Sequence, residues 1–323
     1  MSATSVERLD ALWDAGLLES SGSDRYTLHQ TIVDYASTRC KDMRARQRLL
    51  SYMLWYIQEY ERDYEALERE QSNILAALDS AEELGMPQAL LQGAINLTSF
   101  MRVRGHYALA HRLLSQAQQV ALQQKDAMGH MHVLRHLADF AEQRGDYAQA
   151  ERYSQEGLDL AQQLGSPRNS ESSLLTTLGL VSFHRGDYER AKNLFEEGLR
   201  LARNFGNNER ICTLLTHLGR VLHFQGNYHQ AEALYQEGLT LAQASEQQEL
   251  LNLLLIYIGG VNLSQGNHPQ AQRYYEEGLV LARSLGHREY LEALLNDMGI
   301  LAYNRGDLEQ TVAYFQKGLA LAR

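Results

Sequence analysis

The chain has 323 residues, of which 44% are hydrophobic and 22% are charged, and its formal net charge is -10. This acidic balance argues against broad binding to the phosphate backbone of nucleic acids, which needs clustered Lys and Arg. The two cysteines, Cys40 and Cys212, indicate no disulfide framework, so we expect a reducing, cytoplasmic compartment. The polar first ten residues and the shortness of the apolar run 250–261 predict neither a signal peptide nor a membrane span.

Residues 1–42 differ in pattern from the rest of the chain. Residues 6–17 have the period of a short amphipathic helix, residues 21–24 are a strong turn signal, and residues 25–28 can return as a strand. Helical periodicity resumes at residues 29–36. This order of helix, hairpin and helix predicts the end of a winged-helix unit. Residues 1–50 carry seven Lys/Arg and seven Asp/Glu, so we expect no nucleic-acid binding there.

Residues 43–87 are predicted to form a helical adaptor. Apolar residues at helical spacing indicate one helix around residues 49–57 and a second around residues 64–78. The sequence Gly85-Met86-Pro87 then breaks the pattern.

Residues 88–323 are predicted to be an array of about six helical hairpins of about 40 residues each. A turn glycine recurs at a nearly constant interval, at Gly105, Gly145, Gly186, Gly226, Gly266 and Gly306. Small residues and one large aromatic follow each glycine at fixed offsets, as Ala191, Phe195, Gly198 and Ala202 follow Gly186. A fixed period of this kind predicts a solenoid, in which small residues allow neighbouring helices to approach.

The third hairpin carries local signals for both ends of its second helix. Asp187 directly follows the turn glycine and is predicted to be the N-cap, and Gly206 is predicted to end the helix. The first hairpin departs from the pattern, with Thr98 and Leu114 where later hairpins have Gly and an aromatic residue.

These hairpins resemble the tetratricopeptide repeat. The resemblance rests on Leu178-Gly179, Leu218-Gly219 and Ile258-Gly259 in the first helices, and on Ala-aromatic pairs such as Ala231 with Tyr235 in the second helices. The period of about 40 exceeds the 34 of the family pattern. The resemblance implies an all-α, right-handed superhelical solenoid, with the adaptor and a winged-helix remnant before it.

A second resemblance covers the N-terminal region. The segments at residues 15–19, 24–36 and 68–85 are similar to the junction in bacterial signal-transducing STAND ATPases, where a winged helix precedes a repeat sensor. The chain has no GxxxxGK[ST] phosphate loop. The resemblance therefore implies a sensor fragment whose partner is the upstream nucleotide-binding module of a parent chain.

The family resemblance places a ligand groove on the first helices, at positions ten, six and three before each turn glycine. We expect a protein or peptide ligand there, with Arg135, Arg220 and His223 as polar anchors. An alternative is that the apolar members only pack against neighbouring first helices. The predicted groove residues are Arg135, Asp139, Thr176, Leu180, Phe183, Thr216, Arg220, His223, Ile256, Leu263, Asn296, Ile300 and Tyr303.

Metal binding and catalysis have weaker signals. His132 and His136 share a helix face at a spacing that suits zinc, but the sequence fixes no third ligand. No nucleophile elbow, HExxH motif or Cys–His pair is present, so we expect no enzyme, no cofactor and no metal. Cys212 lies in an apolar stretch and is predicted to fill the core.

The leading hypothesis is a non-catalytic sensor that captures a ligand in the groove and regulates an attached STAND nucleotide switch. The alternative is a free-standing scaffold that bridges protein partners. A sensor fragment should expose the apolar face around Leu12 and Trp13, whereas a scaffold should bury it. Because the last hairpin has no polar capping helix, we also expect weak self-association.

Overall fold

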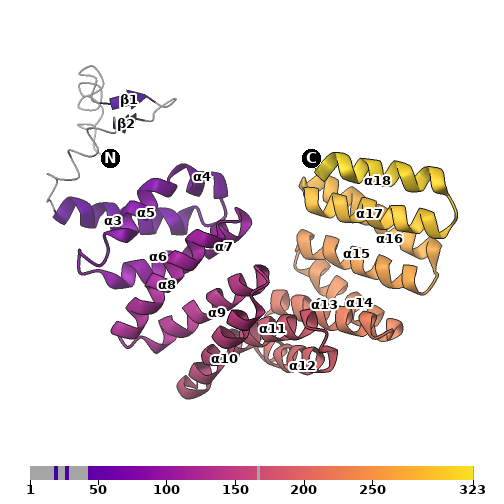
Figure 1. Cartoon of the computed structure of the whole chain (residues 1–323), viewed down its shortest axis with the longest axis horizontal. Helices are drawn as coiled ribbons and strands as arrows, with labels where there is room; N and C mark the ends of the chain where they lie inside the picture. The colour runs from indigo at the N-terminus through magenta and orange to yellow at the C-terminus, as the bar shows by residue number, and fades with distance from the viewer. Residues whose placement is uncertain (1–17, 21–25, 29–42, 166–167, 323) are drawn as a thin grey trace. The chain divides into compact units, whose positions relative to one another are not determined.

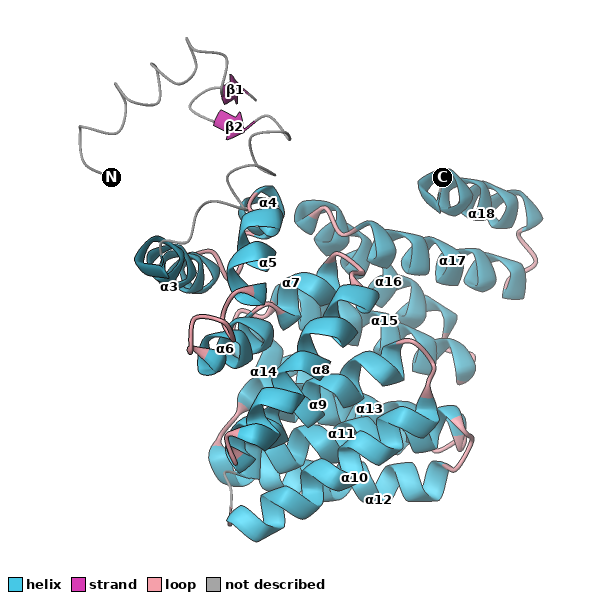
Figure 2. Ribbon diagram, turned by 60° about the vertical axis from the view of Figure 1, so that its left-hand side comes forward, coloured by secondary structure: helices cyan, strands magenta, loops and turns pink. Residues whose placement is uncertain are grey.

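The computed structural model of the protein describes residues 18–20, 26–28, 43–165 and 168–322. The chain divides into two compact units, Met1–Ala89 and Leu90–Arg323. Helices account for nearly all of the described residues (Figure 2), which confirms the predicted all-α class. The finer division into a winged-helix remnant, an adaptor and an array stays a prediction.

The first unit begins with a two-stranded hairpin. Strand β1, Leu18–Ser20, pairs antiparallel with β2, Tyr26–Leu28, and Leu18 lies opposite Leu28. The predicted returning strand is therefore confirmed. The helices predicted at residues 6–17 and 29–36 lie outside the described residues.

The helices of the first unit are α3, Met43–Glu59, α4, Tyr64–Arg69, and α5, Gln71–Asp79, and α5 packs against α3. The prediction of one uninterrupted second helix is wrong at a single residue. Glu70 ends α4 and begins α5 with a ψ angle of 6°, and the Asn73 amide donates to its carboxylate at 2.7 Å. The helical pattern of apolar residues continues across this break, so periodicity alone did not reveal it.

The second unit consists of hairpins that follow one another as antiparallel helix pairs (Figure 1). In each pair the first helix contacts its own second helix, and from α9 to α17 each first helix also contacts the first helix of the neighbouring hairpin. The pairs are α6, Pro87–Asn96, and α7, Thr98–Val103, with α8, Tyr107–Gln123; α9, Ala127–Gln143, with α10, Tyr147–Leu164; α11, Arg168–His184, with α12, Tyr188–Phe205; α13, Asn208–Phe224, with α14, Tyr228–Ala244; α15, Gln248–Ser264, with α16, His268–Leu285; and α17, Arg288–Asn304, with α18, Leu308–Ala322.

The ends of the helices follow the predicted signals. Gly186 adopts a φ of +80°, which a residue with a side chain rarely occupies, and so allows the tight turn before α12. Asp187 caps α12 by accepting a hydrogen bond from the backbone N–H of Arg190 at 3.1 Å. Gly206 ends that helix in the left-handed conformation. Both predicted caps are confirmed.

Each central hairpin is held together by a glycine that faces an aromatic ring. A Cβ added at Gly219 of α13 would overlap the Tyr235 ring of α14, and Gly259 has the same relation to Tyr275. Tyr235 and Tyr275 are fully buried as a result. The predicted close approach at small residues is therefore confirmed.

A second repeated contact joins the two helices near the other end of the hairpin. The Ser172 hydroxyl donates to the Gly198 carbonyl at 2.9 Å, and the Asn252 amide donates to the Gly278 carbonyl at the same distance. Cys212 occupies the equivalent place in α13, with its sulfur 3.5 Å from the Gly238 carbonyl. Burial raises the pKa of this thiol to about 11, so Cys212 fills the core as a neutral thiol, as predicted.

The first and last hairpins differ from the central ones. In the first, the helix breaks at Leu97, where the Thr98 hydroxyl donates back to the Ile95 carbonyl at 2.7 Å. In the last, Phe315 is 41% exposed, whereas its equivalent Tyr275 is fully buried. The difference arises because a following first helix covers Tyr275.

A candidate ligand-binding face on the first helices

The first helices of consecutive hairpins touch through a row of polar and aromatic side chains. We call this surface the first-helix face and define it by Asp139, Glu142, Thr177, Phe183, His184, Arg220, His223, Tyr257 and Ser264. Between α9 and α11 the Thr177 hydroxyl donates to Asp139 at 2.7 Å. In the same interface His184 Nε2 lies 3.3 Å from Glu142 Oε1. The polar residues of this face are therefore fixed by contacts between hairpins.

Arg220 of α13 lies between two aromatic rings from neighbouring helices. Its guanidinium carbon is 4.7 Å from the centre of the Phe183 ring and 5.8 Å from the centre of the Tyr257 ring. Cation–π contacts of this kind hold a guanidinium in place without neutralising its charge. His223 Nε2 is 2.9 Å from the Ser264 hydroxyl of α15. Arg220 thus keeps a full positive charge at the middle of the face.

Three further arginines come from three different hairpins and act electrostatically on one another. Arg102 of α7 and Arg210 of α13 both act electrostatically on Arg135 of α9. Burial lowers the pKa of Arg135 and of Arg210. The Asp139 charge raises both pKa values, and the Arg102 charge lowers both. We call Arg102, Arg135, Arg210 and Arg220 the arginine cluster.

The histidines next to this cluster are neutral. Burial and the Arg220 charge lower the pKa of His217 to about 3, and burial with Arg135 moves the pKa of His136 well below its ordinary value. A neutral His136 can accept from Arg135, whose Nη2 lies 2.6 Å from its Nε2. The His217 ring stacks on Phe195 with centroids 5.3 Å apart. These imidazoles orient the arginines and add no charge.

The arginine cluster lacks the close carboxylate partners that other arginines have. Arg185 and Arg190 share Glu151 at 2.5 and 2.8 Å, and Arg203 is paired with Glu237 at 2.5 Å. Within the cluster, the shortest carboxylate distance is the 3.9 Å between Arg135 and Asp139. No other carboxylate of the described residues lies within 4.0 Å of these four guanidinium groups.

Towards α17 the predicted groove positions become apolar and accessible. Ile256 and Leu263 are half-buried, whereas Ile300 is 38% exposed and Tyr303 is 64% exposed. Asn296 is also exposed. The surface therefore changes along the array from cationic to apolar.

Two of the predicted groove residues have buried side chains that bond within their own helix. Thr176 and Thr216 are buried, and each hydroxyl donates to a carbonyl of its own helix, at 2.7 and 2.8 Å. Conversely, Arg102, Arg210 and Tyr257 were not among the groove residues predicted from the sequence. Arg102 does stand three residues before a turn glycine, so the same offset rule applied to the first hairpin would have found it.

Two buried phenol groups lie behind this face without a hydrogen-bond partner. The hydroxyls of Tyr235 and Tyr275 are buried and make no hydrogen bond. The Tyr235 ring stacks on Tyr257, and the Tyr275 hydroxyl would lie 3.9 Å from a Cβ added at Gly260. Burial raises the pKa of both phenols, so they are neutral.

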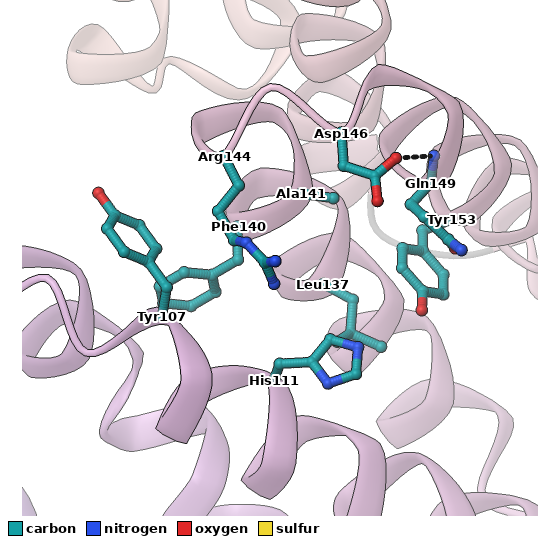
Figure 3. Close-up of a pocket in the computed structure, with 9 residues that line it drawn as sticks. All are labelled: Tyr107, His111, Leu137, Phe140, Ala141, Arg144, Asp146, Gln149 and Tyr153. Carbon is teal, nitrogen blue, oxygen red and sulfur yellow. Dashed lines mark hydrogen bonds between the residues drawn. The ribbon is translucent and has the colours of Figure 1, made fainter.

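A separate small pocket lies between the first and second hairpins (Figure 3). Its volume is about 270 Å³, and its lining residues are Tyr107, His111, Leu137, Phe140, Ala141, Arg144, Asp146, Gln149 and Tyr153. At the next junction Glu151 occupies the place of His111 and pairs with Arg185. The pocket thus lies where this ion pair is missing.

The described residues include no group of three or more His, Cys, Asp or Glu placed to hold a metal ion. His136 makes its contact with Arg135, as described above. None of the helices in the described ranges has the length and apolar character needed to cross a membrane.

The sequence of the central hairpins matches a known family. Residues 130–204 and 169–244 match the tetratricopeptide repeat model. Residues 130–244 carry tetratricopeptide repeats. No sequence among curated proteins matches it.

Solved structures with the same fold extend the similarity beyond the matched repeats. The apo form of RapI is 13% identical, with a TM-score of 0.65 over 85% of this chain and 97% of that one. NprR in complex with its cognate peptide NprX is 15% identical, with a TM-score of 0.58 over 85% of this chain and 78% of that one. A STAND protein with a tetratricopeptide repeat sensor, from Pyrococcus horikoshii, is 15% identical, with a TM-score of 0.57 over 96% of this chain and 53% of that one. The tetratricopeptide repeat array thus has the fold of these proteins.

Proposed function

We propose that the tetratricopeptide repeat array is a non-catalytic sensor module that captures a protein or peptide segment on its first-helix face. The observation that carries the proposal is the arginine cluster, in which His136 contacts Arg135, two aromatic rings contact Arg220, and the shortest carboxylate distance is 3.9 Å. Charges that are oriented but not neutralised are typical of binding surfaces rather than of packing. The accessible Ile300 and Tyr303 supply apolar contact area on the same row of first helices.

The structural neighbours support a peptide or protein as the ligand. NprR is described with a cognate peptide bound, and a Rap protein is described in complex with Competence and Sporulation Factor. The STAND neighbour covers 96% of this chain and carries its repeats as a sensor. We therefore propose that ligand capture regulates an attached nucleotide-binding module of a parent chain.

The test is a pull-down from bacterial lysate with the native chain and with a variant that carries Arg135→Glu, Arg220→Glu and His223→Glu. A matched control carries Arg185→Glu, Arg190→Glu and His229→Glu, which places the same charges away from the first-helix face. We expect one protein or peptide to be captured by the native chain and by the control but lost by the first variant. Equal loss from both variants would refute the assignment to the first-helix face.

The alternative proposal, a free-standing scaffold, predicts a different N-terminal region. The chain has two tryptophans, Trp13 and Trp55. In a Trp55→Phe variant the remaining fluorescence reports on Trp13 alone. The sensor proposal predicts strong quenching of Trp13 by acrylamide, because the apolar face around Trp13 would be covered only by the attached module. The scaffold proposal predicts protection of Trp13 in the isolated chain.

A further inference from the structure

The charge of the first-helix face is opposite to that of the chain as a whole. The chain has 40 acidic and 30 basic residues, yet four arginines of its first helices act electrostatically on one another or on His217 beside this face. The carboxylates that act on them are Asp139, Glu142 and Glu209. A concentration of positive charge in an acidic protein indicates selection for a partner rather than for solubility.

The nearby carboxylates are already engaged by other groups. Asp139 accepts a hydrogen bond from the Thr177 hydroxyl, and Glu142 contacts His184. Burial raises the pKa of Glu142, and the Asp139 charge raises it further. Neutralisation of the arginine cluster from within the protein is therefore incomplete.

The arginines are also partly removed from water. The Arg135 side chain is 22% exposed, and Arg210 is half-buried. A desolvated guanidinium without a close carboxylate is costly, and a carboxylate that arrives with a ligand offsets this cost through short, bidentate hydrogen bonds. The histidines beside the cluster, His136 and His217, are neutral and do not repel the arginines further.

We propose that the first-helix face selects an acidic peptide segment, whose carboxylates bind Arg135 and Arg210 and whose apolar side chains lie towards Ile300 and Tyr303. This inference rests on the proposed function and names the chemical class of its ligand. Arg102 and Arg220 add positive charge near this carboxylate site. The ligand thus has a direction, with its acidic part at α9 and α13 and its apolar part at α17.

The test uses a library of linear heptapeptides with randomised positions, selected by affinity and read by mass spectrometry. One library has free carboxyl termini and the other has amidated termini, so that side-chain carboxylates are distinguished from a terminal carboxylate. The native chain is compared with Arg135→Gln/Arg210→Gln and with the control Arg185→Gln/Arg190→Gln. Both variants lose two positive charges, but the control loses them from the Glu151 ion pairs.

We expect the native chain and the control to enrich acidic peptides at least tenfold over neutral ones, and the Arg135→Gln/Arg210→Gln variant to lose this preference while it still retains apolar peptides. Enrichment of peptides without any acidic preference would overturn this inference and leave the proposed function intact. The absence of any enriched peptide would overturn both. An equal loss of acidic preference in the control would overturn the placement of the carboxylate site.

A charge-preserving variant separates loss of charge from loss of fold. In Arg135→Lys/Arg210→Lys the positive charges remain, but the bidentate geometry does not. We expect partial retention of the acidic preference and a steep fall of the enrichment as salt rises from 50 to about 500 mM. Complete loss in a variant whose circular dichroism matches the native chain would refute a role for the charge itself.

Discussion

The two faces of each first helix follow different rules. The back, which packs on the partner helix, repeats the same chemistry, since Gly179, Gly219 and Gly259 each receive an aromatic ring. The first-helix face does not repeat. Six residues before the turn glycine, the side chain is Asp139, Leu180, Arg220, Gly260 or Ile300, depending on the hairpin.

The contrast shows at which positions the fold restricts the type of side chain and at which positions it does not. Each hairpin must bury the same back against its own second helix, so substitutions there are limited by shape. The first-helix face only has to be compatible with its neighbours, so it can hold charges in one hairpin and apolar groups in another. Binding specificity therefore lies in the differences between repeats.

Two adjacent glycines of α15 test the difference between the two faces of a first helix most directly. In Gly259→Ala the new methyl group overlaps the Tyr275 ring, and we expect a loss of about 1–3 kcal/mol in the free energy of unfolding. In Gly260→Ala the nearest atoms are at 3.8 and 3.9 Å, and the better helix propensity should add up to about 1 kcal/mol. Urea denaturation of both variants measures the difference, and equal effects would contradict the assignment of the two faces.

Asp297, in the first helix of the last hairpin, tests how burial of a carboxyl affects stability. Burial raises its pKa from 3.8 to about 6. Between about pH 4 and pH 6 the folded state therefore binds more protons than the unfolded state, so stability falls as the pH rises through this window. The shift corresponds to a loss of at most about 3 kcal/mol.

We expect Asp297→Asn to remove this part of the pH dependence and to be more stable than the native chain at pH 7.5. Urea denaturation at pH 4.0 and pH 7.5 measures the effect. Asp159→Asn, at an exposed position of α10, is the control and should keep the native pH profile. An identical pH profile in Asp297→Asn and the native chain would show that the carboxyl is not held in a desolvated place.

The Tyr235 hydroxyl offers a smaller test of the same packing. It is buried without a hydrogen-bond partner, and the third hairpin has Phe195 at the equivalent position. Removal of an unsatisfied buried hydroxyl should stabilise the fold, so we expect Tyr235→Phe to gain about 1 kcal/mol. A rise of the thermal midpoint checks this, and Tyr228→Phe at a half-buried position is the control. A marked loss of stability would mean that the hydroxyl has a partner, such as a bound water.

The smallest expected effect concerns the arginines that are paired. Glu151→Gln removes the carboxylate shared by Arg185 and Arg190, whose side chains are 41% and 47% exposed. Solvent-exposed pairs contribute little, so we expect a loss below about 1 kcal/mol that disappears in 1 M salt. Denaturation midpoints at low and high salt measure it. An effect that persists in 1 M salt would show that these arginines are not screened, in contrast to what their exposure indicates.

The period of the repeat and the residues on each helix face follow from the amino-acid sequence alone. Turn glycines at nearly constant spacing, Asp187 as a cap and Gly219 opposite Tyr235 are local features, because their offsets within one hairpin fix which residues share a helix face. The break at Leu97 was not predicted, because the apolar spacing continues through it and only the backward hydrogen bond of Thr98 marks it.

The tertiary structure is needed to show which residues of different hairpins approach one another. Arg102 and Arg135 stand three and ten residues before a turn glycine, but Arg210 fits none of the predicted offsets, and the three are separated by more than 30 residues at each step. Their approach depends on how each hairpin packs on the next, which is set by many contacts together. The same packing buries Thr176 and Thr216 at positions where the offset rule placed ligand contacts. Spacing fixes a face within a helix, whereas the packing between helices decides what that face can bind.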